Sequence, residues 1–99
     1  MIAAIDIETR GLDATKFILG SIQTDRHKKP ETYHNKEALW NRVKELGESE
    51  RRRGKMLNVY HHNANYDTAG YMNYEEKGLK ILSLKPYIAE LKNIKFLVL

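Results

Sequence analysis

Short runs of apolar and β-branched residues divide the first third of the chain into three predicted strands. Residues 2–8 are apolar on both faces until the acids begin, which is typical of a buried central strand. Residues 16–24 form a second run, in which Gly20 indicates a bulge or a close approach. Residues 31–34 form a short third run. The short turns between these runs predict an antiparallel meander.

A helical pattern follows the third strand. Asn35 has the side chain of an N-cap. The apolar residues beyond it recur at helical spacing, and they are Leu39, Trp40, Val43 and Leu46. Gly47 is a plausible end for this helix, although the charged residues 48–53 could prolong it.

The second half of the chain is expected to contain both further strands and a second helix. Residues 55–61 predict a strand, and the helix before it implies a crossover connection and parallel pairing. A second helix is predicted over residues 66–77, closed by Gly78. Up to three short strands follow, the last over residues 94–99. The pattern predicts one mixed α/β domain spanning residues 1–99.

Composition restricts the class of protein. The 99 residues are 41% hydrophobic and 30% charged, as in an ordinary globular domain. No apolar run approaches the roughly 20 residues of a membrane span, and no secretory signal is evident, so we expect a cytoplasmic protein with no membrane partner. The absence of cysteine excludes disulfides, thiolate metal sites and cysteine nucleophiles.

The charge balance is mildly basic. The net charge of +4 and the isoelectric point of about 9.3 favour a polyanionic partner without identifying one. The basic residues are densest in two groups, residues 26–29 and residues 51–55. Each group is either a solvated loop or a contact surface for nucleic acid.

Asp6 and Glu8 stand two residues apart at the end of the first predicted strand. Residues i and i+2 of a strand share a face, so these carboxylates should lie side by side. Like charges this close repel, and one carboxylate should bind a proton unless a cation lies between them. The pair is therefore either a solvated strand end or a cation site.

A second polar cluster follows the strand that ends near residue 61. Asp67 falls in the first turn of the second predicted helix, where it could simply cap the helix or complement its dipole, with Asn63 or Asn65 forming a turn. Alternatively, Asp67 converges with Asp6 and Glu8, because strand ends and adjoining loops meet at one sheet edge in α/β folds. Three carboxylates suit magnesium or manganese better than zinc or copper.

The adjacent residues His61 and His62 raise the alternative of a zinc site. Neighbouring residues of a regular strand point to opposite faces of the sheet. The two imidazoles therefore cannot both bind one ion while the strand stays regular.

The segments "DIET" and "HNANYD", in this order and about 60 residues apart, resemble the first two motifs of the DEDD-type 3′–5′ exonucleases. The similarity is greatest to the proofreading domains of protein-primed family B DNA polymerases. It implies a ribonuclease H-like mixed sheet, ββ(β)αβα with C-terminal strands, and a link to DNA replication. It also implies that Asp6, Glu8 and Asp67 hold two Mg²⁺ or Mn²⁺ ions and are catalytic. The residues expected to contact a single-stranded 3′ end are Thr9, Arg10, His62, Asn63 and Tyr66.

The chain departs from this family at its third motif, a Tyr or His followed after three further residues by Asp. The four aspartates of the chain are preceded at that distance by Ile2, Thr9, Ser21 and Asn63. We therefore expect a fold truncated before its last helix, whose open edge a homodimer could bury. The expected function is that of a metal-dependent 3′–5′ exonuclease on single-stranded DNA, with weak or incomplete activity. The alternatives are an inactive relative that binds nucleic acid or a protein partner, and a structural protein with vestigial motifs.

Overall fold

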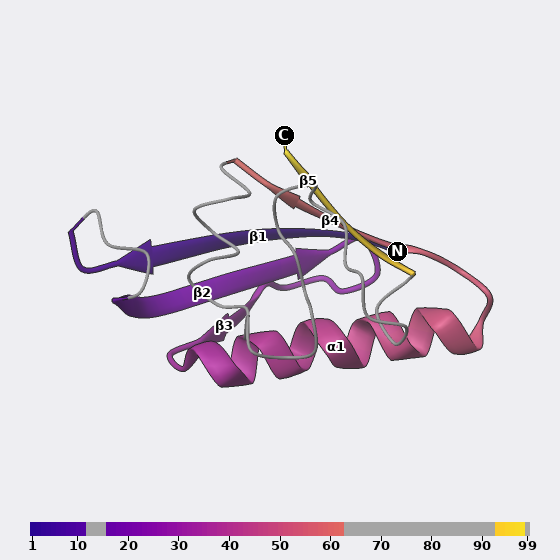
Figure 1. The fold of residues 1–99 in the computed structure, drawn as a ribbon, viewed down its shortest axis with the longest axis horizontal. Helices are drawn as coiled ribbons and strands as arrows, with labels where there is room; N and C mark the ends of the chain where they lie inside the picture. Colours follow the sequence, from indigo (N-terminus) through magenta and orange to yellow (C-terminus); the bar gives the residue numbers. More distant parts are fainter. Residues whose placement is uncertain (12–15, 63–92, 99) are drawn as a thin grey trace.

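The computed structural model describes residues 1–11, 16–62 and 93–98, which form a five-stranded sheet with one long helix packed against it (Figure 1). The strands are β1 (Ile2–Thr9), β2 (Phe17–Thr24), β3 (Glu31–Tyr33), β4 (Leu57–His61) and β5 (Ile94–Val98), and the helix is α1 (Lys36–Arg52). Their order in the sheet is β3-β2-β1-β4-β5. The prediction of a mixed α/β fold is confirmed.

The sheet combines a meander with a crossover. β1, β2 and β3 pair antiparallel in sequence order, as predicted. The chain then crosses the sheet as α1, and β4 pairs in parallel with the other edge of β1. Such a parallel neighbour requires a crossover, because a tight turn would reverse the strand direction. β5 adds to β4 in parallel, so β1 is the middle strand of the five.

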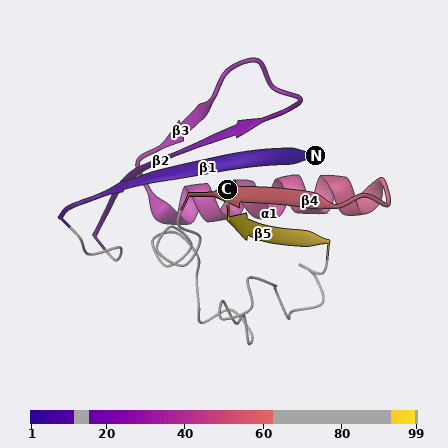
Figure 2. The same cartoon turned by 90° about the horizontal axis from the view of Figure 1, so that it is seen from above.

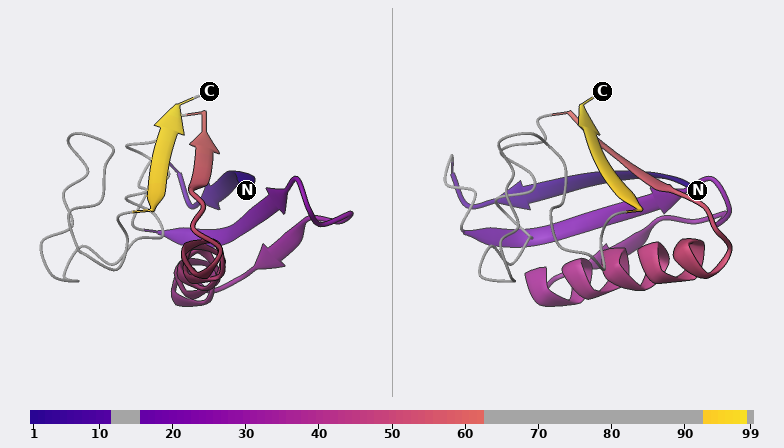
Figure 3. Two further views of the ribbon diagram at one scale, coloured as in Figure 1. Left: turned by 90° about the vertical axis from the view of Figure 1, so that its right-hand side faces the viewer. Right: turned by 45° about the vertical axis from the view of Figure 1, so that its right-hand side comes forward.

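The side chains of β1 alternate between a covered and an exposed face. Ala3, Ile5 and Ile7 are buried in the core, whereas the residues between them are exposed. The expectation that β1 is buried on both faces is therefore wrong. The physical reason is that α1 lies against one face only, as its end-on view below the sheet shows (Figure 3, left).

Helix α1 begins where the capping pattern predicts. The side-chain oxygen of Asn35 accepts a hydrogen bond from the Ala38 amide at 3.0 Å, which satisfies one of the free donors of the first turn. The predicted apolar stripe is buried against the sheet, and Trp40 lies 6.4 Å from Phe96 between ring centroids. At the edge of the sheet, Arg42 forms an ion pair with Glu31 of β3 (Nε–Oε1 2.8 Å).

Gly47 does not end the helix, and the alternative that residues 48–53 prolong it is the correct one. α1 continues to Arg52. A Cβ atom at position 47 would collide with Ile94 Cδ1 and would lie 2.8 Å from its Cγ1. Gly47 is thus a contact point that lets α1 approach β5. Gly20 serves the same purpose in β2, where a Cβ would lie 2.6 Å from Leu39 Cδ2, so the expected close approach is confirmed.

The parallel pairing of β1 and β4 is short. It runs from Ile2↔Asn58 to Ala4↔Tyr60, although β1 continues to Thr9. β4 instead stays paired with β5 through His61↔Val98. From above, the arrows of β1 and β4 end well apart (Figure 2), and β4 and β5 are steeply rotated relative to β1 and β2 (Figure 3, left). The carboxyl end of β1 is therefore unpaired on its β4 side within the described residues.

Several predicted elements lie outside the described residues. These are the helix over residues 66–77 with Gly78 and the strands expected before residue 94. The strand predicted at residue 94 is confirmed as β5. Within the part of the chain that the structure describes, no helix is long and apolar enough to cross a lipid bilayer.

Candidate functional site

Asp6 and Glu8 lie side by side on the exposed face of the central strand, as predicted. Their register partners on β2 are Ser21 for Asp6 and Leu19 for Glu8. Both carboxylates are exposed, so water and salt screen their mutual repulsion. Within the described residues, they lie beyond the last residue pair that joins β1 to β4.

Thr9 and Arg10 lie at the same end of β1, next to the two carboxylates. The register shifts between Glu8 and Thr9, and such an irregularity re-aims the side chain beside it. The Thr9 hydroxyl donates to the carbonyl of Gly11 at 3.0 Å, and the Arg10 amide donates to the carbonyl of Lys16 at 2.9 Å. Gly11 has a φ of 68°, which glycine adopts without strain. The strand end is thus held in one conformation by local bonds.

His62 is the predicted nucleic-acid contact on the neighbouring strand. It is exposed and follows Tyr60 by two residues, so it continues the exposed face of β4. Tyr60 pairs with Ala4, and Asp6 lies two residues beyond Ala4. Asp6 and His62 therefore occupy equivalent positions just past the end of the pairing between these parallel strands.

His61 faces the opposite way and is fully buried on the α1 side of the sheet. Its ring lies 6.2 Å from that of Phe96. Burial lowers the pKa of His61 to about 4, and a hydrogen bond with the backbone of Leu97 offsets part of this effect. The two adjacent imidazoles lie on opposite faces, as predicted, so they cannot share one zinc ion.

The remaining predicted site residues lie outside the described residues. These are Asn63, Tyr66 and Asp67. Among the described residues, no group of three or more His, Asp or Glu side chains is placed to hold a metal ion. Asp6 and Glu8 thus supply two carboxylates of the kind that a hard divalent cation prefers, and any third carboxylate must come from elsewhere in the chain.

A buried carboxylate at the other end of β1 was not among the predicted site residues. Glu50 of α1 has no exposed surface, and it forms ion pairs with the amine of Met1 (3.1 Å), with Arg26 (Nη2–Oε2 3.2 Å) and with Arg53 (3.6 Å). Burial alone would raise the pKa of Glu50, but hydrogen bonds from Arg26 and the amine outweigh it and lower the pKa. Position 50 continues the helical spacing of Val43 and Leu46, which is the sequence signal for its burial.

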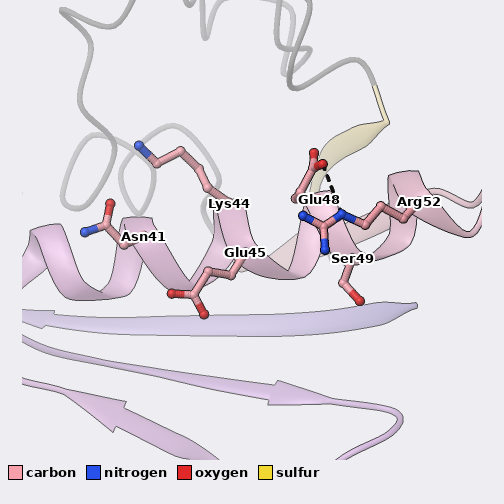
Figure 4. Close-up of a pocket in the computed structure, with 6 residues that line it drawn as sticks. All are labelled: Asn41, Lys44, Glu45, Glu48, Ser49 and Arg52. Carbon is pink, nitrogen blue, oxygen red and sulfur yellow. Dashed lines mark ion pairs between the residues drawn. The ribbon is translucent and has the colours of Figure 1, made fainter.

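A pocket lies on α1 (Figure 4). Helix α1 covers the buried face of β1, whereas Asp6 and Glu8 are on the opposite, exposed face. It is lined by Asn41, Lys44, Glu45, Glu48, Ser49 and Arg52. Glu48 forms ion pairs with Arg51 (Nε–Oε2 2.7 Å) and with Arg52 (3.4 Å), so its negative charge is compensated within α1. This arrangement is typical of a solvated helix surface rather than of a catalytic site.

Comparison with protein families, with curated proteins and with solved structures returned no match to this chain. Any assignment of function therefore rests on the chain's own residues and their placement.

Proposed function

We propose that this chain is a metal-dependent 3′–5′ exonuclease-like protein that acts on single-stranded DNA or on 3′ ends. The observation that carries the proposal is the placement of Asp6 and Glu8 on one exposed face, at the carboxyl end of the central strand and beyond its described pairing with β4. The order of three strands, one helix and a parallel strand also agrees with the start of the ββ(β)αβα layout of ribonuclease H-like exonucleases.

The donor set fits magnesium or manganese. Asp6 and Glu8 would hold the cation from β1, and Asp67 would complete the site with a third carboxylate. Divalent cations, when bound there, supply activation of a water molecule and neutralise charge on the leaving oxygen. The carboxylates are exposed, so a substrate can reach them without opening the core.

The neighbouring side chains have substrate-binding roles in this proposal. Arg10 offers a guanidinium to a phosphate beside the scissile bond. Thr9 follows Glu8 on β1, and His62, the residue directly after β4, would approach from the neighbouring strand. Asn63 and Tyr66 would hold the terminal nucleotide, with the Tyr66 ring stacking on a base in a sequence-independent manner.

The absence of a third motif bears on the rate. The family's proton-handling group typically contributes about 10²–10⁴-fold to the rate. No Tyr or His stands at the required distance before any aspartate of this chain. We therefore expect slow cleavage, which will be detected only at an enzyme concentration well above that of a typical exonuclease assay.

Degradation of a 5′-labelled single-stranded oligonucleotide tests the proposal. Wild type should give a 3′-to-5′ ladder with Mg²⁺ or Mn²⁺ and none with chelator. Asp6→Asn and Asp67→Ala should each reduce the rate by more than the roughly 10- to 100-fold typical of residues that only support a metal ligand.

Glu45→Gln is the matched control, because Glu45 is an exposed carboxylate on α1, across the sheet from the site. Its rate should equal that of wild type. A ladder that persists in Asp6→Asn, or that needs no metal, would contradict the proposal.

A further inference from the structure

The two dense basic groups, residues 26–29 and 51–55, lie at the end of the molecule opposite to Asp6 and Glu8. The turn after β2, the start of β1 and the carboxyl end of α1 all lie at the right of Figure 1, whereas β1 ends at the left; Figure 2 agrees. At about 3.3 Å per residue, the five residues from Met1 to Asp6 separate the two ends by about 17 Å. The two basic groups, distant in sequence, are neighbours here.

Glu50 joins these two groups. Arg26 reaches it from residues 26–29, and Arg53 reaches it from residues 51–55. Because the carboxylate is fully buried and hydrogen-bonded, it fixes the two segments relative to each other. The arginines are nevertheless accessible, since 32% of the Arg26 side chain and 51% of the Arg53 side chain remain exposed.

Each segment is also tied to the rest of the fold by backbone hydrogen bonds. In the first, the Asp25 amide donates to the Ile2 carbonyl at 2.9 Å, and the His27 amide donates to the Thr24 hydroxyl at 3.1 Å. In the second, the Lys55 amide donates to the Glu50 carbonyl at 2.9 Å. A surface held in place before binding loses little conformational entropy when a ligand arrives.

The charge of this surface is large for so few residues. Residues 25–29 and 48–55 contain seven Lys or Arg and three acids, a surplus equal to the net charge of the whole chain, +4. Lys28, Lys29 and Lys55 are exposed. Four of the seven are arginines, whose planar guanidinium can pair with phosphate oxygens. Arg26 and Arg51 each already donate two hydrogen bonds to a carboxylate, which leaves less of their donor capacity for phosphate. Apart from Pro30, residues 25–30 and 51–55 carry no apolar side chain that would insert into a lipid surface.

We propose that residues 26–29 and 51–55, joined by Glu50, form one surface that binds the phosphodiester backbone of single-stranded nucleic acid away from the carboxylates. The partner class rests on the proposed function, but the binding does not require cleavage. The simpler explanation is that Arg51 and Arg52, in the last turn, only complement the helix dipole. That explanation predicts no contribution to nucleic-acid affinity.

The test is the salt dependence of binding to a fluorescent single-stranded 20-mer, measured by anisotropy with chelator present throughout. Lys28→Gln/Lys29→Gln removes charge from the first segment, and Arg52→Gln/Lys55→Gln removes it from the second. All four side chains are exposed, so folding should be preserved. A plot of the logarithm of the binding constant against the logarithm of salt concentration has a negative slope. Each variant should make this slope shallower by up to about 1.4, because each phosphate contact on a single strand contributes about 0.7.

Lys16→Gln/Lys36→Gln is the control. It removes the same charge from two exposed lysines outside the two basic segments, one before β2 and one at the start of α1. Its slope should stay near that of wild type. An equal loss in this control, a loss in only one of the two surface variants, or tight binding to anionic vesicles without oligonucleotide binding would each overturn the inference. If cleavage depends on metal but both surface variants keep the wild-type slope, the inference about the basic surface is wrong and the proposed function still stands.

Discussion

At the scale of single residues, the carboxylates near the two ends of β1 have opposite environments. Asp6 and Glu8 are exposed to water, whereas Glu50 is buried and surrounded by positive groups. A carboxylate that is exposed at a strand end is available to a cation from solution. One that already accepts hydrogen bonds from Arg26 and the Met1 amine is structural.

Glu50→Gln should therefore lower stability without touching the candidate site. The substitution keeps the shape of the side chain but leaves the buried amine of Met1 and the partly exposed Arg26 without their shared counter-ion. Breaking such a pair typically costs about 3 kcal/mol or more of the free energy of unfolding, which urea denaturation measures. Glu48→Gln on the same helix removes an exposed carboxylate and should leave the midpoint close to that of wild type. Equal midpoints for the two variants would contradict the structural role of Glu50.

His61 gives the protein a defined dependence on pH. Its pKa is about 4 when folded and about 6.5 when unfolded, so the unfolded state binds the proton more readily between these values. Neutral His61 therefore makes its full contribution to the free energy of unfolding above pH 6.5. This contribution, about 3 kcal/mol in total, is lost as the pH falls toward 4. His61→Leu should flatten the stability profile in this window relative to wild type. Parallel profiles for the two proteins from pH 6.5 to 4 would show that His61 is accessible to protons in the folded state.

At the scale of elements, the contact between α1 and β5 depends on one missing side chain. Gly47→Ala would gain helix propensity of about 1 kcal/mol. It would also push a methyl group into Ile94, which is only 1% exposed and whose Cδ1 and Cγ1 atoms would both have to shift within the core. Overpacking of this kind costs about 1–3 kcal/mol, so the net effect should be destabilising.

The double variant Gly47→Ala/Ile94→Val separates these two effects. Ile94→Val removes Cδ1, the atom that the new methyl group would meet most closely. The double variant should be more stable than the sum of the single changes in free energy predicts, because the two positions are in contact. Strict additivity in thermal or urea denaturation would show that the contact tolerates the extra methyl group.

Much of this architecture follows from the pattern of residues. The five described strands and the helix lie where runs of apolar and β-branched residues, helical spacing and Asn35 predict them, since these signals are local. The errors arise where distant residues decide the outcome. Gly47 has the local signal of a helix end, but β5 needs its small size, and Glu50 is buried because Arg26 and the amine, distant in sequence, neutralise it.

The candidate site is predictable to a similar degree. The shared face of Asp6 and Glu8 follows from the two-residue period of a strand, and the opposite facing of His61 and His62 follows from the same rule. The exposure of the carboxylate face does not follow from the pattern, because the apolar residues Ile2 and Ala4 on that face suggested a covering layer.

At the scale of the whole molecule, charge is separated along the length of β1. Carboxylates mark one end, and the basic segments joined by Glu50 mark the other. A single nucleic-acid strand that extends from one end to the other would meet a cation-binding region and a phosphate-binding region in turn. The two regions are held by different elements, so each can be removed without disturbing the other.

The proposed function depends first on the binding of a divalent cation by the carboxylates at the end of β1. Titration of ¹⁵N-labelled protein with Mn²⁺, followed by NMR, tests this binding most directly, because a bound paramagnetic ion broadens the amide signals nearest to it. We expect selective loss of the signals of residues 6–10 and of His62, with the signals of residues 26–29 and 51–55 retained, and no selective loss in Asp6→Asn. Uniform broadening, or selective loss that persists in Asp6→Asn, would contradict a cation site at this strand end.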